Sequence, residues 1–274
     1  MTVGLAPDLP TEPLGRSSIG GYLTQMFAVA AAEVTKLRHD PIELASRAVQ
    51  PILWLVLFGQ VMAHVRGLTV GGGSYLDFLA PGILAQSVLF VAIFYGLSAI
   101  WERDLGVLHR YMVSPAPRSA LVIGKALASS VRGISQSVVI YVCAALMGVK
   151  LSFNPADIAL VLLFIVMASA LFSTFSLIIA CIVKTRERFM GVGQFLTMPI
   201  FFASNAIYPI SVMPPWLRAT VRLNPLSYQV DALRSLMLSA GHSEFGLPVD
   251  FAALAFGFAV FVVIATRMYP RLTQ

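Results

Sequence analysis

Apolar residues in this chain gather into six long runs, and the charged residues lie between them. The runs cover residues 48–65, 78–100, 133–149, 158–183, 189–207 and 251–266, and none of them contains Asp, Glu, Lys or Arg. A helix needs roughly 20 apolar residues to cross about 30 Å of hydrocarbon. The pattern therefore predicts six membrane-spanning helices. The third extends backward over residues 121–132, and the sixth over residues 247–250.

The composition agrees with a chain that lies in a bilayer. Hydrophobic residues make up 58% of the sequence and charged residues 12%, and the mean hydropathy is +0.82. Soluble domains hold about 45–50% apolar and about 25% charged residues. The alternation of polar and apolar residues that marks a membrane β-barrel is absent from the sequence. The predicted fold class is therefore an all-α membrane protein.

The distribution of Lys and Arg predicts the orientation of the spans. If the N-terminus is inside, fourteen of the nineteen basic residues fall in the inner segments, and five (Arg66, Lys150, Arg218, Arg222 and Arg234) fall outside. Both termini are therefore predicted to be cytoplasmic. The net charge of +6 is accounted for by this distribution, so no nucleic-acid partner is expected.

The segment before the first run divides into two parts. Residues 1–21 hold three prolines and are expected to form a disordered cytoplasmic leader, with no apolar stretch typical of a cleavable signal peptide. Residues 22–41 repeat apolar positions at steps of four and three, which predicts an amphipathic helix on the inner leaflet. Its apolar face includes Leu23, Phe27, Val34 and Leu37. The alternative is an ordinary solvated helix.

Chemistry that is missing narrows the function. The sequence has no G-x-x-x-x-G-K-[ST] phosphate loop, no His or Cys pair at metal-ligand spacing and no Gly-x-Ser-x-Gly nucleophile motif. No catalytic or metal-ligating residue is therefore expected, and the chain is predicted not to be an enzyme. All thirteen acidic residues lie outside the six runs, which argues against an ion-coupled carrier with a carboxylate at mid-membrane.

Polar and aromatic residues inside the runs are candidates for a substrate path. Two explanations compete with this one, because Ser, Thr and Gln also join packed membrane helices and Phe and Met also face lipid. The candidate path residues are Gln86, Phe90, Phe94, Gln194, Phe195, Met198, Phe202 and Asn205.

A charged, helix-compatible segment follows the second run. Leu105, Leu108 and Met112 are spaced three and four apart and share one helix face, while Arg103 and Arg110 can point elsewhere. Such a helix has an apolar ridge that fits a groove on a partner. Ser114-Pro115 is expected to end it.

Two motifs give the chain a family resemblance. Glu102-Arg103-x-x-Gly106-x-Leu108-x-x-x-Met112-x-Ser114-Pro115, followed by Gly124-Lys125, resembles the coupling-helix region of bacterial ABC-2 type permeases. Asn224-Pro225-Leu226-Ser227-Tyr228-x-x-Asp231-Ala232-Leu233-Arg234 is similar to a second motif of that family. The sequence departs from many relatives at His109-Arg110-Tyr111, where an acidic, leucine-rich turn is common.

The resemblance implies where the functional regions lie. Residues 42–274 would form one ABC-2 type transmembrane domain, with a cytoplasmic coupling helix between the second and third spans and a re-entrant extracellular hairpin between the fifth and sixth. The hairpin would act as an exit gate, or alternatively as a simple lid, and Asp231 and Arg234 could pair within it. The ATPase-coupling residues would be Glu102, Arg103, Leu105, Gly106, Leu108, Arg110, Met112, Ser114 and Pro115. The exit-gate residues would be Asn224, Pro225, Tyr228, Asp231 and Arg234.

The resemblance also implies a function. The chain would be the permease of an ABC exporter in the bacterial plasma membrane, working with two copies of a separate ATPase that bind the ATP and Mg, and with a second permease chain, identical or homologous. This chain would bind membrane lipid but no cofactor. The expected cargo is a hydrophobic drug, natural product or lipid. The alternatives are a polysaccharide or glycolipid exporter, an ion-coupled carrier or channel without an ATPase, and a structural subunit.

Overall fold

The computed structural model describes residues 31, 35, 46, 49–59, 61, 74–106, 118–183, 185–239 and 241–269. These residues are helical apart from short connections and one isolated antiparallel bridge between Leu151 and Leu238. The elements are η1 (Trp54–Phe58), α4 (Tyr75–Tyr95), α5 (Leu97–Asp104), α7 (Arg118–Leu146), α8 (Pro155–Ile182), α9 (Arg186–Phe202), η2 (Ile210–Val212), α10 (Pro215–Leu223), α11 (Pro225–Met237) and α12 (Leu247–Met268).

Among the described residues, four helical segments are long and apolar enough to span a membrane. They cover Tyr75–Asp104, Ser119–Leu146, Pro155–Ile182 and Leu247–Met268, and they correspond to the second, third, fourth and sixth apolar runs. The predicted extensions of the third and sixth runs are confirmed, because α7 begins at Arg118 and α12 at Leu247. In the first run, the described part includes a shorter apolar helix, Val49–Phe58.

The fifth run forms a shorter helix than the sequence predicts. α9 has 17 residues and ends at Phe202, three residues after Pro199. At about 1.5 Å per residue it is roughly 25 Å long, slightly less than the hydrocarbon thickness. The all-helical fold is therefore confirmed for the described residues, while the six-span topology stays a prediction.

Local sequence signals fix where several helices begin. Ser74 and Asp77 form a reciprocal capping box at the start of α4. The side-chain oxygen of Asn154 accepts a hydrogen bond from the backbone N–H of Ala156, and Pro155 occupies the first turn of α8. Thr185 caps α9 in a similar way. These caps satisfy backbone donors that a helix cannot satisfy itself.

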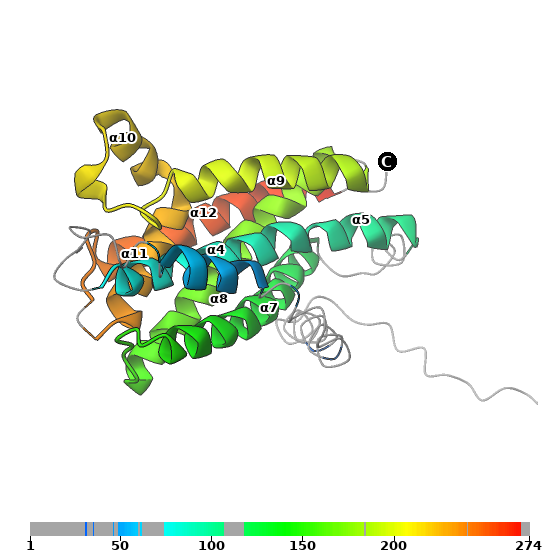
Figure 1. The fold of residues 1–274 in the computed structure, drawn as a ribbon. Helices are drawn as coiled ribbons and strands as arrows, with labels where there is room; N and C mark the ends of the chain where they lie inside the picture. The colour runs from blue at the N-terminus through cyan, green and yellow to red at the C-terminus, as the bar shows by residue number, and fades with distance from the viewer. Residues whose placement is uncertain are drawn as a thin grey trace, which may run out of the picture.

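The long helices run side by side, with α8 in contact with α7, α12, α4 and α11 (Figure 1). At one end lie α5, the first turn of α9 and the last turn of α12, and we call this the α5 end. At the other end lie α10, α11 and the first turn of α12, and we call this the α11 end (Figure 1).

The junction between α4 and α5 packs closely against α8. Gly96 lies between the two helices, and a Cβ atom at this position would collide with the side chain of Ser176 on α8. Because Gly96 has no side chain, the hydroxyl of Ser176 reaches past it and donates a hydrogen bond to the carbonyl of Ile93. This contact sets the direction in which α5 leaves α4.

The position of one carboxylate corrects a sequence prediction. α12 begins four residues earlier than the apolar run, so Asp250 lies in the first turn of a candidate membrane span and is fully buried. The expectation that every acidic residue lies outside the spans is wrong for Asp77, Glu102, Asp104 and Asp157, which lie in terminal turns of other candidate spans, and likewise for Asp250. Its place is at the α11 end of the helix, not in the middle.

Gly82 on α4 allows another close backbone approach. A Cβ atom there would meet the backbone carbonyl group of Ala206, which follows α9. A backbone group cannot rotate away as a side chain can, so any larger residue must push the two segments apart. At Gly191 on α9, by contrast, a Cβ would have no described neighbour within 4 Å.

Gly82→Ala is therefore expected to destabilise the protein by about 1–3 kcal/mol, the usual cost of overpacking. Gly191→Ala is the matched control and should be neutral or slightly stabilising, because Ala is the better helix former by about 1 kcal/mol. Thermal unfolding of the purified variants in detergent checks both. Equal melting temperatures for the two variants would contradict the close approach.

Candidate functional site

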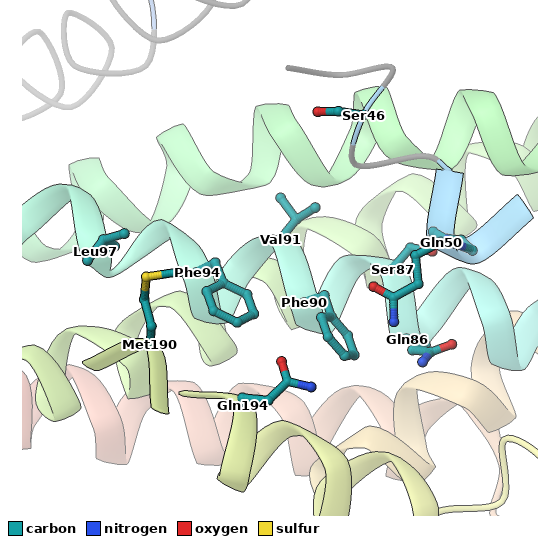
Figure 2. Close-up of a pocket in the computed structure, with 11 residues that line it drawn as sticks. Ser46, Gln50, Gln86, Ser87, Phe90, Val91, Phe94, Leu97, Met190 and Gln194 are labelled. Atoms are coloured by element: carbon teal, nitrogen blue, oxygen red, sulfur yellow. The ribbon is translucent and has the colours of Figure 1, made fainter. Parts of the chain in front are cut away.

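A cavity of about 390 Å³ lies between the N-terminal part of the described chain, α4 and α9. Figure 2 shows the side chains of Phe90 and Phe94 reaching from α4 into the space above Gln194 of α9. The lining residues are Ser46, Gln50, Pro51, Gln86, Ser87, Phe90, Val91, Phe94, Leu97, Met190 and Gln194.

Four of the eight candidate path residues meet in this cavity. They are Gln86, Phe90, Phe94 and Gln194. The other four are not among its lining residues. Phe195 and Phe202 are exposed on α9 and Met198 is partly exposed, whereas Asn205 is fully buried beyond the end of α9.

Sequence reasoning missed the contribution of the first apolar run to this site. Gln50 and Pro51 line the cavity. Gln50 is a polar residue in the first run and directly precedes the apolar stretch from Pro51 to Phe58. That isolated amide was the available signal. Met190, one turn before Gln194 on α9, was also missed.

The described lining residues offer aromatic faces and amides, and none of them is charged. The rings of Phe90 and Phe94 lie 6.2 Å apart between centroids, and three lining residues, Gln50, Gln86 and Gln194, carry amides. The Oε1 atom of Gln86 is buried and accepts no hydrogen bond from the described residues. An amphipathic molecule with a few hydrogen-bonding groups suits such a lining.

Most hydroxyl groups in the apolar helices have local partners instead. Ser87, Thr174 and Thr197 each donate to the carbonyl four residues earlier in their own helix. Ser130 on α7 also donates across to the carbonyl of Val166 on α8. These hydroxyl groups are therefore satisfied within the protein, although only the bond of Ser130 joins two helices and Ser87 also lines the cavity.

The coupling segment begins as predicted but does not continue as one helix. α5 ends at Asp104, Leu105 is its C-cap, and Gly106 has a φ of +71°. This left-handed conformation is easy for glycine and ends a helix. The expectation of a single helix from Glu102 to Ser114 is therefore wrong at Gly106.

The α5 end carries both a charged cluster and exposed apolar surface. Glu102 and Arg103 make ion pairs, described below, while Leu105 is 71% exposed. Of the predicted interfacial helix only Ala31 and Thr35 are described, and both are helical. The other predicted coupling residues and the four named residues of the interfacial helix lie outside the described residues. They are Leu108, Arg110, Met112, Ser114 and Pro115, and Leu23, Phe27, Val34 and Leu37.

The predicted exit-gate residues hold α11 in place at the other end. The Asn224 side chain caps α11 by accepting from Leu226 N, and its amide donates to the carbonyls of Ile200 and Ala203 at the end of α9. Pro225 occupies the first turn, and Tyr228 donates to the carbonyl of Arg222 on α10. The first turn of α11 is thus fastened to its neighbours.

The far end of α11 is tied to the connection between α7 and α8. Around the bridge between Leu151 and Leu238, Ser152 N donates to the carbonyl of Met237 at 2.8 Å and Ser239 N donates to that of Lys150 at 3.0 Å. Lys150 N also donates to the carboxylate of Asp77 in the first turn of α4, at 3.1 Å.

The predicted pair between Asp231 and Arg234 is not among the ion pairs of the described residues, because each side chain has other partners. Arg234 is directed toward α4 and α9, where it donates to the carbonyl of Asn205 at 2.8 Å and lies 3.9 Å from the ring centroid of Phe78. Burial lowers the pKa of Arg234 to about 10, and the nearby carboxylates of Asp231 and Glu244 oppose the shift. The guanidinium stays protonated at neutral pH.

Asp231 binds the loop before α12. Its carboxylate accepts hydrogen bonds from Glu244 N and Phe245 N, both at 3.0 Å, and from the hydroxyl of Ser243 at 2.5 Å. Asp250 lies beside it: its Oδ2 atom accepts a long hydrogen bond of 3.4 Å from the Ser243 hydroxyl, and its Oδ1 atom is buried without a partner among the described residues. Two buried carboxylates therefore meet here with unequal hydrogen bonding.

Asp231→Asn should cost about 1–3 kcal/mol of stability, because the amide replaces one acceptor oxygen and leaves buried donors unsatisfied. Asp250→Asn has the same shape change and is expected to cost less than about 1 kcal/mol, since little hydrogen bonding is lost. Thermal unfolding in detergent distinguishes them. A larger loss for Asp250→Asn than for Asp231→Asn would show that the hydrogen bonds of Asp231 do not hold the loop.

Comparison with known proteins agrees with the motifs. The family model described as "ABC-2 type transporter" matches residues 24–238. The chain is 29% identical to ycf38 of Cyanophora paradoxa, named as a transport permease, over 78% of this chain and 74% of the relative. It is 23% identical to the daunorubicin resistance ABC transporter permease protein DrrB1 of Streptomyces coeruleorubidus, over 94% of this chain and 89% of the relative.

A further relative is the inner membrane transport permease YadH of Escherichia coli K12, with 24% identity over 81% of this chain and 87% of the relative. The family match extends from the segment before the first apolar run to the end of α11, so it includes both motifs and the cavity. The chain belongs to the ABC-2 type transporter family and is a transport permease, the membrane subunit of an ABC transporter.

Proposed function

We propose that this permease is part of an exporter that moves a hydrophobic or amphipathic molecule, a drug, natural product or lipid, out across the bacterial plasma membrane. Two copies of a separate ATPase dock at the α5 end and bind the ATP and Mg, while this chain carries no cofactor. A second permease chain, identical or homologous, completes the transmembrane unit.

One observation supports the proposal most: α4, which lines the cavity, leads into α5, whose exposed surface is where the partner ATPase would bind. α4 supplies Gln86, Phe90 and Phe94 to the cavity, and beyond Gly96 it leads into α5, where Trp101 and Leu105 are exposed. A displacement of α5 would therefore reach the cavity through one short helical path. A permease needs such a path, since its task is to change its affinity for cargo between two states.

The lining supports the choice of cargo. The described lining residues are aromatic, aliphatic or polar and uncharged, which suits a cargo with a large apolar part. The name of the relative DrrB1 refers to daunorubicin resistance, which makes flat, amphipathic drugs the first class to test. A glycolipid remains the second class, because three amides can bind hydroxyl groups.

The exposed face of α9 supports a second permease chain beside the cavity. Phe195 and Phe202, seven residues apart on one side of this helix, are large apolar residues with open surface. Leu53, Trp54, Leu57, Phe58 and Val61 form another apolar surface in the first run. Both surfaces belong to elements near the cavity, so a second chain seated on them would close it.

Basic residues support the orientation. Arg103, Lys125, Arg186, Arg188 and Arg267 lie on the segments that approach the α5 end, in or near its terminal turns. This bias favours a cytoplasmic α5 end and an outward-facing α11 end. The ATPases would then dock from the cytoplasm.

The test is purification of the tagged full-length chain in mild detergent with whatever ATPase accompanies it, followed by reconstitution in liposomes. ATP-dependent movement of daunorubicin or a fluorescent short-chain phospholipid would support the exporter. If only a glycolipid were moved, the cargo would be a glycolipid and not a drug or phospholipid. Transport driven by an ion gradient without ATP would overturn the proposal in favour of a carrier.

Two substitutions in the cavity should weaken cargo binding. Phe90→Ala removes an aromatic wall and Gln194→Ala removes an amide, and each is expected to raise the cargo concentration for half-maximal ATPase stimulation by about 3- to 10-fold, equivalent to roughly 1 kcal/mol. Phe256→Ala on the exposed face of α12 is the matched control and should change nothing. An equal effect of all three substitutions would exclude the cavity as the cargo site.

A further inference from the structure

The partner-facing end of α5 is held by two other helices. On one side, the Nζ atom of Lys125 on α7 lies 2.6 Å from the carboxylate of Glu102, and the side chains are 10% and 24% exposed. On the other side, Arg186 at the start of α9 contacts Trp101 and Asp104. The last turn of α5 therefore sits between α7 and α9.

The contact with α9 has a defined geometry. The Nε and Nη2 atoms of Arg186 lie 2.9 and 2.8 Å from Oδ2 of Asp104, and its guanidinium carbon lies 3.8 Å from the centroid of the Trp101 ring. The other oxygen of Asp104 accepts a hydrogen bond from Arg103 at 2.9 Å. The Nε–H group donates a hydrogen bond while the planar guanidinium stacks on the ring, and Lys cannot do both.

Arg186 lies on the helix that forms one wall of the cavity. Met190 and Gln194 follow Arg186 by four and eight residues, so all three lie along one side of α9. Phe189 is fully buried and belongs to the same apolar cluster as Ala99 and Ile100 of α5. A movement of α5 is thus transmitted to α9 about 12 Å from the cavity residue Gln194, at 1.5 Å per residue.

The two attachments differ in burial, which separates their roles. The Glu102–Lys125 pair is largely buried, and breaking it leaves a charge without a partner, so it holds α5 to α7 structurally. Arg186 and Asp104 are 38% and 33% exposed. Exposed ion pairs add little to folding free energy. A contribution to stability is therefore a weak explanation for the contact among Trp101, Asp104 and Arg186.

We propose that Trp101, Asp104 and Arg186 form a joint that makes α9 follow α5 when the partner ATPase moves α5. Arg186 is then a positioning residue, which acts on the cargo cavity through Met190 and Gln194 and touches no nucleotide. The part of the inference that concerns transport rests on the proposed exporter function. The mechanical link between α5 and α9 can be tested without it.

The mechanical test uses the purified full chain and hydrogen–deuterium exchange of the first two turns of α9. Arg186→Gln and Asp104→Asn should each raise exchange in residues 186–194. Exchange in the double variant should not exceed that in the more affected single variant, because both substitutions act through one contact. Arg188→Gln removes the same charge from the same exposed turn and is the matched control. Unchanged exchange in Asp104→Asn would overturn the joint, whatever the protein transports.

The functional test compares cargo moved per ATP hydrolysed in liposomes with the co-purified ATPase. Arg186→Gln should lower this ratio by about fivefold or more, the lower end of typical coupling between sites. The basal ATPase rate and the cargo concentration for half-maximal stimulation should stay unchanged. Arg186→Lys should give a ratio between those of Arg186→Gln and the wild type. The control Arg188→Gln should keep the wild-type ratio.

The outcomes separate the two proposals. A normal transport ratio in Arg186→Gln overturns the joint as a transmission element and leaves the exporter intact. A wild-type protein that shows no ATP-driven transport overturns the exporter, and the exchange experiment then decides the joint. A loss of both melting temperature and ratio in Arg186→Gln would overturn the joint as well, because a merely structural role would explain it.

Discussion

The arrangement of the functional parts depends on how closely α4 and α8 approach each other at Gly96. The missing side chain of Gly96 lets Ser176 bond to the Ile93 carbonyl. The Ile93 carbonyl also accepts a hydrogen bond from Gly96 N at 3.2 Å, so breaking the contact leaves the Ser176 hydroxyl, not the carbonyl, without its partner in an apolar environment, which is costly. The contact fixes where α4 stops and how α5 projects. The aromatic walls before it and the charged cluster after it are both placed by this junction.

Much of the helical framework could be predicted from the sequence, because apolar runs and caps act locally. The capping box of Ser74 and Asp77 and the Asn154-Pro155 pair are local signals that stand at the observed helix starts. Gly106 shows the limit of periodicity. The spacing of Leu105, Leu108 and Met112 suits a helix, but the backbone at Gly106 turns left-handed and ends it. A single glycine ends the helix although the apolar spacing continues, since helical spacing does not show where a chain leaves the helix.

Long-range partners could not be predicted, because they depend on which helices become neighbours. Asp231 and Arg234 are close in sequence and opposite in charge, yet each finds a partner on another segment. Within the candidate cavity, residues of α4 and α9 were predicted because their amides and rings stand out in apolar runs. Gln50 was missed, although the same kind of signal was present. Sequence pattern identifies unusual residues, and only the packing of the helices shows which of them share a space.

The ties at the α11 end divide the molecule into parts of unequal freedom. Hydrogen bonds around Leu151 and Leu238, together with the bond from Lys150 to Asp77, join the ends of α4, α7, α8 and α11. Among the described elements α9 has fewer neighbours, mainly α4, α5 and α8, and Asn224 ties only its end to α11. The cavity lies on the boundary between α4 and α9, so a compound that fits too tightly would hold the two walls together. The difference between a cargo and an inhibitor of this permease is then a matter of size and stiffness as much as of affinity.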